Sequence, residues 1–108
     1  MPQAVVLGEF EQFVLSALLL IEDEPYALRL REELGRLTGR SVSRGALYRT
    51  LDRLESKGYV RAAVEKGGPA RRGHLRRRFT VTARGRQMLR ASRDTWMAIW
   101  HEVAGVLD

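Results

Sequence analysis

Apolar side chains recur at helical spacing in the first part of the chain. Residues 9–22 keep one apolar face, and three leucines outside that face widen it well beyond a single stripe. We therefore predict a first helix that is buried on several sides. Acidic residues and Pro25 then break the pattern. The next leucines share one face from about Tyr26 to Thr38, which predicts a second helix that ends at Gly39.

A third helix is expected between Ser43 and Gly58. Ser43 is a suitable N-terminal cap, and the leucines that follow it are spaced by four and three residues, namely Leu47, Leu51 and Leu54. Lys57-Gly58 ends the pattern. Three short helices with tight connections are typical of a helix-turn-helix.

The period of the apolar residues changes to two after Tyr59. Apolar and polar residues alternate over residues 60–65 and again over residues 78–82, which predicts two strands. The segment between them contains K-G-G-P-A-R-R-G-H, which is rich in turn-forming and basic residues. Two strands around such a loop, directly after a helix-turn-helix, predict a β-hairpin wing.

The last segment, from Thr82 to about Leu107, has no proline and predicts one helix of roughly 25 residues. Its seam positions are spaced by three and four residues, as in a coiled coil: Leu89, Ser92, Trp96, Ile99, Val103 and Val106. A head of three short helices is too small to cover such a stripe. We expect a mainly α fold with a small β-hairpin (α+β), in which residues 1–82 form a winged helix-turn-helix DNA-binding domain and residues 83–108 a dimerisation helix.

The charge distribution points to a polyanion as partner. The 108 residues are 44% hydrophobic and 30% charged, which is typical of a globular domain, and the net charge is +6. Residues 66–93 carry ten basic residues and no acidic one. Such a block favours a face that binds nucleic acid, because basic side chains that neutralise phosphates release counterions. The alternative is an ordinary solvated face, although such faces tend to mix both signs of charge. Most of the basic residues are arginines, which suits phosphates and guanine edges, although genomic base composition produces the same bias.

Several other functions are disfavoured by the residues that the chain lacks. It has no cysteine, which excludes disulfides and thiolate zinc sites. No nucleophile–base pairing, metal-ligand spacing or phosphate-loop motif is present, so we expect neither an enzyme nor a cofactor. The longest apolar run, residues 13–21, is about half the length of a membrane span, and acidic residues precede it. A cytoplasmic protein is expected.

The third helix carries the first group of candidate DNA-binding residues. With its three leucines turned inward, Arg49 and Arg53 face away from the core. Ser41, Ser43 and Arg44 lie at its N-terminal end, where recognition helices contact base edges and free N–H groups suit a phosphate. An ordinary amphipathic helix with two exposed arginines is the alternative interpretation.

The wing carries the second group. A basic, glycine-rich loop can reach phosphates or an adjacent minor groove. The candidate residues here are Lys66, Arg71, Arg72, His74 and Arg76. His74 has no second ligand nearby, which favours a solvated or phosphate-contacting side chain over a metal ligand.

Three stretches resemble PadR-family transcriptional regulators: E-F-E-Q-F-V-L-S-A-L in the first helix, S-R-G-A-L-Y-R-T-L-D-R-L-E-S-K-G-Y-V in the third helix and its exit, and R-R-R-F-T-V-T-A-R-G-R-Q-M-L at the second strand. The resemblance runs from about Leu7 to Leu107, and the single short C-terminal helix is similar to the family's smaller subgroup. It implies a cytoplasmic homodimer that binds promoter DNA through the third helix and wing, usually as a repressor released by a small molecule. In that pattern Ser43, Tyr48 and Arg49 fall on positions associated with DNA contact.

Two positions depart from the family pattern. The usual tyrosine pair at the second strand is Arg78-Phe79 here, which removes hydroxyl partners. The glycine often found near the start of the second helix is missing from P-Y-A-L-R-L. Neither departure disturbs the hydrophobic pattern.

The remaining candidates concern the dimer interface and an effector, and they are Phe10, Leu89, Trp96, Ile99, Trp100 and Val103. Trp96 and Trp100 lie one helical turn apart on the seam. They are either large interface side chains or the walls of a flat pocket for a planar aromatic effector, and the sequence leaves both interpretations open. The main rival function is a winged-helix protein-interaction module without sequence-specific DNA binding, because a fold does not determine function.

Overall fold

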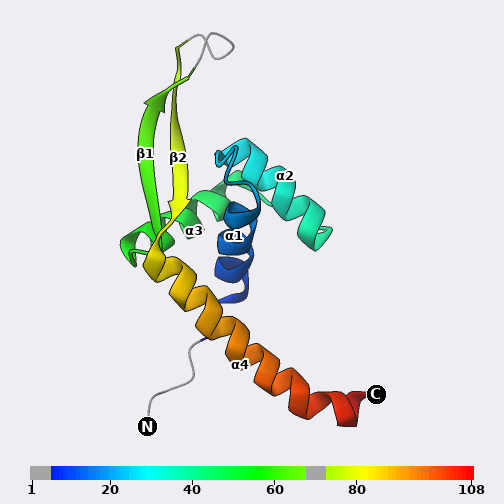
Figure 1. Cartoon of the computed structure of the whole chain (residues 1–108). Helices are drawn as coiled ribbons and strands as arrows, with labels where there is room; N and C mark the ends of the chain where they lie inside the picture. The colour runs from blue at the N-terminus through cyan, green and yellow to red at the C-terminus, as the bar shows by residue number, and fades with distance from the viewer. Residues whose placement is uncertain (1–5, 68–72) are drawn as a thin grey trace.

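The structure is a computed structural model, and it describes residues 6–67 and 73–108. Its elements are α1 (Glu9–Leu20), α2 (Ala27–Thr38), α3 (Arg44–Ser56), β1 (Val60–Lys66), β2 (Leu75–Val81) and α4 (Ala83–Leu107). The three short helices form one body, from which the hairpin projects on one side and α4 on the other (Figure 1). The predicted α+β winged helix-turn-helix with a long C-terminal helix is therefore confirmed.

Two element bounds differ from those expected. α1 ends at Leu20, because the backbone leaves helical geometry at Ile21, whose N–H group bonds to the carbonyls of Ala17 and Leu18. β2 begins at Leu75, earlier than the alternation of apolar residues indicated. The added part of this strand consists of Leu75, Arg76 and Arg77. A strand whose two faces both meet solvent leaves no alternating pattern in the sequence.

The hydrophobic core lies between α1, α2, α3 and the base of the hairpin. Its most deeply buried side chains are aliphatic or aromatic and come from all these elements: Val14, Leu15, Leu18, Leu30, Leu34, Leu47, Leu51, Leu54, Val60 and Phe79. α1 contacts α2, α3, α4 and β2, as its broad apolar surface predicted. Leu37 shares a face with Leu30 and Leu34 but remains 42% exposed, because the last turn of α2 extends past the core.

The hairpin is a two-stranded antiparallel sheet in which Val60 lies opposite Val81 and Lys66 lies opposite Leu75. Only its base joins the core. Val60, Phe79 and Val81 are buried there, whereas Val64 and Leu75, nearer the tip, are 64% and 68% exposed. The outer part of the wing therefore stands free of the core (Figure 1).

The start of α4 is fixed against the end of α3. The Thr82 hydroxyl accepts a hydrogen bond from the Gly85 N–H group (3.0 Å) and donates one to the Gly58 carbonyl (2.6 Å). The backbone of α4 then passes directly over Tyr59, so that a Cβ atom at Gly85 would overlap the Tyr59 carbonyl oxygen. Glycine is required at this position by the close approach of two backbones.

Most of α4 extends away from the rest of the subunit. Only Gly85 and Ser92 of its residues are buried, and every residue from 101 to 108 is exposed. The radius of gyration is 16.0 Å, compared with about 13 Å for a compact domain of this length. No helix in the described ranges is long and apolar enough to cross a membrane.

We expect Gly85→Ala to destabilise the fold by about 1–3 kcal/mol or more, because the added methyl group overlaps a backbone carbonyl. Gly105→Ala is the matched control on the same helix. No atom lies within 4 Å of a Cβ at Gly105, so this change should be neutral or stabilise the helix by up to about 1 kcal/mol. Thermal unfolding followed by circular dichroism measures both. Equal melting temperatures for the two variants would contradict the close approach.

Candidate nucleic-acid interface

The outer face of α3 is polar and open to solvent. Arg49 and Arg53 are exposed, as the inward placement of the leucines predicted, and Arg44, Gly45 and Asp52 are exposed as well. Ser43 caps the helix, since its hydroxyl accepts a hydrogen bond from the Ala46 N–H group at 3.1 Å. The first turn of α3 therefore presents backbone N–H groups and Arg44 together at one end of the helix.

Arg49 folds back along α3 over the small residue Gly45. A Cβ atom at Gly45 would lie 3.2 Å from the Arg49 Nη1 atom. The guanidinium group therefore occupies the space that a larger side chain would fill. The N-terminal half of α3 therefore has a positively charged surface without a large protruding side chain at position 45, and a nucleic acid can approach it closely.

Tyr26 attaches the wing to the start of α2 at a point further out than its buried base. Its hydroxyl donates a hydrogen bond to Glu65 Oε1 and accepts one from Arg78 Nη1 (3.3 Å). The Arg76 guanidinium lies 3.7 Å from the centre of the Tyr26 ring, and its Nε atom is 3.4 Å from Glu65 Oε1, which is an ion pair rather than a hydrogen bond. In addition, the Phe79 N–H group donates to the Pro25 carbonyl at 3.0 Å. The wing and α2 are thus held together by both strands of the hairpin.

The same contacts fix the charge of Glu65. The hydrogen bond from Tyr26, followed by the positive charges of Arg76 and Arg78, holds the pKa of Glu65 below its ordinary value. Glu65 is therefore ionised at neutral pH. Arg76, a predicted DNA contact, has its guanidinium engaged with Tyr26 and Glu65 in the free protein.

A cavity of about 460 Å³ lies between the start of α2, α3 and β2. Four arginines from these three elements line it, and we call it the arginine notch: Arg31, Arg44, Arg76 and Arg77. Tyr48 also lines the notch. The structure therefore brings three predicted site residues together here, namely Arg44, Tyr48 and Arg76.

Other candidates lie apart from the notch. Arg53 lies in the last turn of α3 and donates a hydrogen bond to the Thr50 hydroxyl at 3.1 Å. Ser41 is exposed before α3, and Lys66 and His74 are exposed towards the outer end of the hairpin. Arg71 and Arg72 lie outside the described residues.

Sequence reasoning missed Tyr26 and Arg31. Tyr26 was expected only as the start of a helix, and Arg31 belongs to a segment in which acidic residues predominate. The Arg31 Nε atom donates to the Val42 carbonyl at 3.1 Å, which positions the side chain beside α3. No local signal identifies either residue, because their roles depend on how α2 packs against the hairpin and α3.

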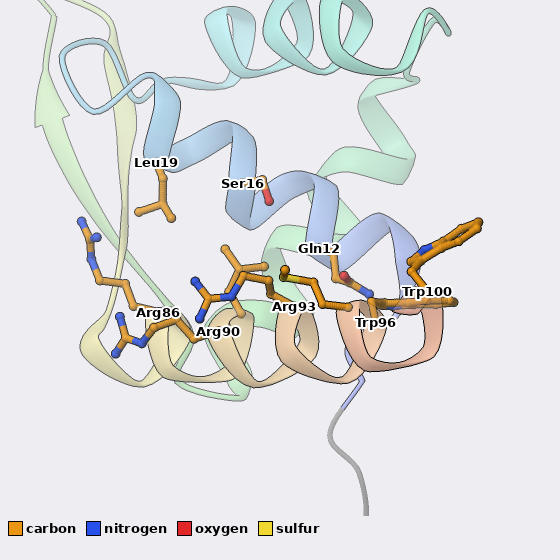
Figure 2. A pocket seen from close by; sticks show the side chains of 10 residues that line it. Gln12, Ser16, Leu19, Arg86, Arg90, Arg93, Trp96 and Trp100 are labelled. Carbon is orange, nitrogen blue, oxygen red and sulfur yellow. The ribbon is translucent and has the colours of Figure 1, made fainter. Parts of the chain in front are cut away.

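A second cavity, of about 500 Å³, is the groove between α1 and α4 (Figure 2). Of the predicted interface residues, Leu89, Trp96 and Trp100 line it. Phe10 instead packs against the core, and Ile99 and Val103 are partly exposed on α4 outside the groove. The described part of the chain contains no cluster of three or more His, Asp or Glu side chains that would hold a metal ion.

Three helices, a hairpin wing and a basic surface at α3 define a winged helix-turn-helix of the DNA-binding class. Residues 17–91 match the model of the transcriptional regulator PadR-like family. The chain belongs to this family, whose members bind DNA and regulate transcription and are not enzymes. The resemblance found in the sequence is therefore confirmed, and so is the expectation that the protein is not an enzyme.

Solved structures of bacterial regulators share the fold over nearly the whole chain. A PadR-like transcription factor from Bacteroides fragilis is 22% identical, with a TM-score of 0.74, and the match covers 92% of this chain and 90% of that one. A PadR-like regulator from Bacillus cereus is 21% identical (TM-score 0.74, covering 94% and 93%). A PadR family regulator from Clostridium difficile is 20% identical (TM-score 0.73, covering 94% and 100%). None of the curated proteins matches the chain.

We expect Glu65→Gln to lower the melting temperature at neutral pH and to flatten its dependence on acid pH. A carboxylate whose pKa is lowered by folding stabilises the fold above its unfolded pKa, and this contribution disappears as the pH falls below about 4.5. Wild type and variant should therefore converge in acid when thermal unfolding is measured from neutral pH downwards. Tyr26→Phe removes the main hydrogen bond to Glu65. The loss of stability in acid should therefore occur at a higher pH in this variant than in the wild type. Parallel curves for all three proteins would contradict the Tyr26–Glu65 link.

Proposed function

We propose that this regulator is a repressor that binds an inverted-repeat operator as a homodimer through α3 and the wing. The observation that carries the proposal is that Arg44, at the start of α3, lines the arginine notch together with arginines from α2 and β2. Arginines from three elements converge there beside the exposed face of the helix. Such an arrangement suits a duplex, because it offers a helix to the major groove and a fixed cationic notch to the adjacent backbone.

In this proposal α3 enters the major groove with its N-terminal half leading. Arg49 and Arg44 contact base edges or adjacent phosphates, with Tyr48, Ser41 and Ser43 beside them. Arginine presents two donors in a plane and therefore suits the O6 and N7 atoms of guanine. Arg53, further along the exposed face of α3, reaches the same duplex.

The notch and the wing contact the sugar–phosphate backbone. Arg31 and Arg77 line the notch together with Arg44, and in the free protein Arg77 pairs with Glu55 at 3.3 Å. Two or more guanidinium groups around one phosphate form short, charge-assisted hydrogen bonds. Arg76 supports this arrangement through Tyr26 and Glu65. Lys66, His74, Arg71 and Arg72 of the wing reach phosphates or the minor groove further along the duplex.

Dimerisation uses residues 83–108, with residues 1–82 as the DNA-binding domain. Trp96, Ile99, Trp100 and Val103 are each at least 39% exposed on α4. A run of large apolar side chains on one exposed helix is typical of an interaction surface. A second copy of α4 buries this seam, and the two-fold axis places the paired α3 helices in successive major grooves about 34 Å apart.

The groove between α1 and α4 is the proposed effector site. A planar aromatic effector stacks on Trp96 and Trp100 between the two subunits and changes the separation of the two α3 helices. Effector binding and operator binding then alter each other's affinity by the same factor. The protein acts in the cytoplasm, where its operator lies.

We expect Arg49→Ala to weaken operator binding by about 1–3 kcal/mol and to relax base preference at one position of each half-site.

The double variant Arg71→Ala/Arg72→Ala should weaken binding to the operator and to a scrambled duplex alike. It should also flatten the slope of log affinity against log salt by about 0.9 for each arginine–phosphate pair that the substitutions remove. Gel shifts across a salt series measure both effects. Arg84→Ala on α4, which lines neither cavity, is the control for the loss of a single positive charge. Equal slopes for wild type and the double variant would show that this part of the wing does not touch DNA.

We expect Ile99→Asp to raise the dimer dissociation constant by more than about a hundredfold, because each subunit would bury an unpaired carboxylate in the seam. Ile99 is 43% exposed in a single subunit, so the subunit itself should stay folded. Ala98→Asp is the matched control, because Ala98 is exposed, lies about 100° around α4 from Ile99 and is not a seam position. Analytical ultracentrifugation distinguishes the two. A wild type that sediments as a monomer at micromolar concentration would refute the dimer.

A further inference from the structure

The exposed face of α3 carries an acidic side chain near its centre. A step of about 100° per residue places Asp52 about 20° from Gly45 around the helix axis and about 60° from Arg49. All three residues are exposed. Because the Cα–Cβ bonds of a helix tilt towards its N-terminus, the Asp52 side chain lies over the turn that bears Arg49. A carboxylate therefore occupies the part of α3 that meets the major groove in the proposed function.

Asp52 makes only one long contact with a cation of the subunit. Among the described residues Arg77 of β2 is its partner, and the distance from Arg77 Nη1 to Asp52 Oδ1 is 3.9 Å, which is beyond hydrogen-bonding range. Arg49 and Arg53, its basic neighbours on α3, form no ion pair with it. The Asp52 side chain is 67% exposed. Its carboxylate oxygens can therefore accept hydrogen bonds from a molecule that binds to this face.

The other acidic residue of α3, Glu55, is placed differently. It lies about 60° further around the helix than Asp52, on the same side as Arg44 and Tyr48, which line the arginine notch. Its Oε2 atom accepts a hydrogen bond from Arg77 Nη2 at 3.3 Å. Glu55 therefore joins α3 to the hairpin, whereas the carboxylate of Asp52 is left to the outer face.

A carboxylate on a helix that enters DNA weakens binding unless it meets a hydrogen-bond donor, because the phosphates repel it. The bases differ in what they present in the major groove. Guanine presents the acceptors N7 and O6, thymine presents the acceptor O4, and adenine presents an amino group beside the acceptor N7. Cytosine presents the N4 amino donor alone. A carboxylate therefore favours cytosine, and its repulsion by the other bases adds to specificity.

We propose that Asp52 is a specificity-determining residue that accepts a hydrogen bond from the N4 amino group of one cytosine in each half-site. The inference rests on the proposed DNA-binding function and adds a base preference that arginines alone do not produce. Three residues separate Arg49 from Asp52, which is a rise of about 4.5 Å along the helix. Base pairs are stacked about 3.4 Å apart. The cytosine therefore lies within about one or two base pairs of the one that Arg49 contacts.

The test uses the full-length protein and an operator that the wild type selects from random duplexes. Each base pair of the half-site is then changed symmetrically, and the affinity is measured by gel shift. We expect one position in each half-site at which the wild type prefers cytosine by at least about tenfold. Asp52→Ala should lose this preference and keep the preferences at the other positions. It should also bind a scrambled duplex more tightly, because a charge that repels phosphates is gone.

Two further variants separate base recognition from charge. Asp52→Asn keeps the size of the side chain, and its amide matches N6 and N7 of adenine, so the preference should move from cytosine to adenine. Glu55→Gln is the matched control, since it removes the same charge from the next turn of α3. It should also tighten binding to the scrambled duplex, but it should keep the preference for cytosine. Circular dichroism of each variant verifies the fold.

The proposal is overturned if Asp52→Ala and Asp52→Asn keep every base preference of the wild type, because Asp52 would then act on DNA only through its charge. Loss of the cytosine preference in Glu55→Gln would overturn it as well, since the effect would not belong to Asp52. In both cases the wild type still selects an operator, and the proposed DNA-binding function stands. A wild type that selects no sequence from the random duplexes contradicts the proposed function itself, and the inference fails with it.

Discussion

The close approach of Gly85 to the Tyr59 carbonyl is the contact on which the remaining architecture depends. It lies where three elements meet: the end of α3, the start of β1 and the first turn of α4. Thr82 adds hydrogen bonds to Gly58 and to Gly85 at the same point. Because backbones that touch directly cannot slide past each other, the direction of α4 is fixed relative to α3. In a dimer built on α4, this junction determines how far apart the two α3 helices lie.

The wing is held by a different kind of contact, and that difference affects the DNA-binding surface. At its base, apolar packing of Val60, Phe79 and Val81 joins it to the core. Further out, Tyr26 and Glu65 replace this packing with a hydrogen bond and paired charges. These contacts tie the wing to α2 as well as to α3. The arginine notch thus has walls on three elements whose relative positions are fixed by the fold before any DNA is bound.

α1 connects the two regions to which we assign function. It forms one wall of the groove beside α4, and a buried hydrogen bond from the Leu7 N–H group to the Ser92 hydroxyl holds the segment before it against α4. At the same end, the buried Glu11 carboxylate pairs with Lys57, the C-terminal cap of α3, at 2.9 Å. A molecule that displaces α1 from α4 therefore acts on a helix that also contacts the DNA-binding helix.

The sequence by itself determined the elements and the class of protein. Periodicity located the three helices, the hairpin and α4, since burial of one face leaves a repeating pattern, and Ser43 was identified as a cap from its position alone. The outward direction of Arg49 and Arg53 followed from the same geometry. Only the tertiary structure decided the role of Tyr26, the inclusion of Arg31 in the notch and the need for glycine at position 85. Each of these depends on contacts between residues far apart in the chain, or on how two elements pack, and such contacts leave no periodic trace in the sequence.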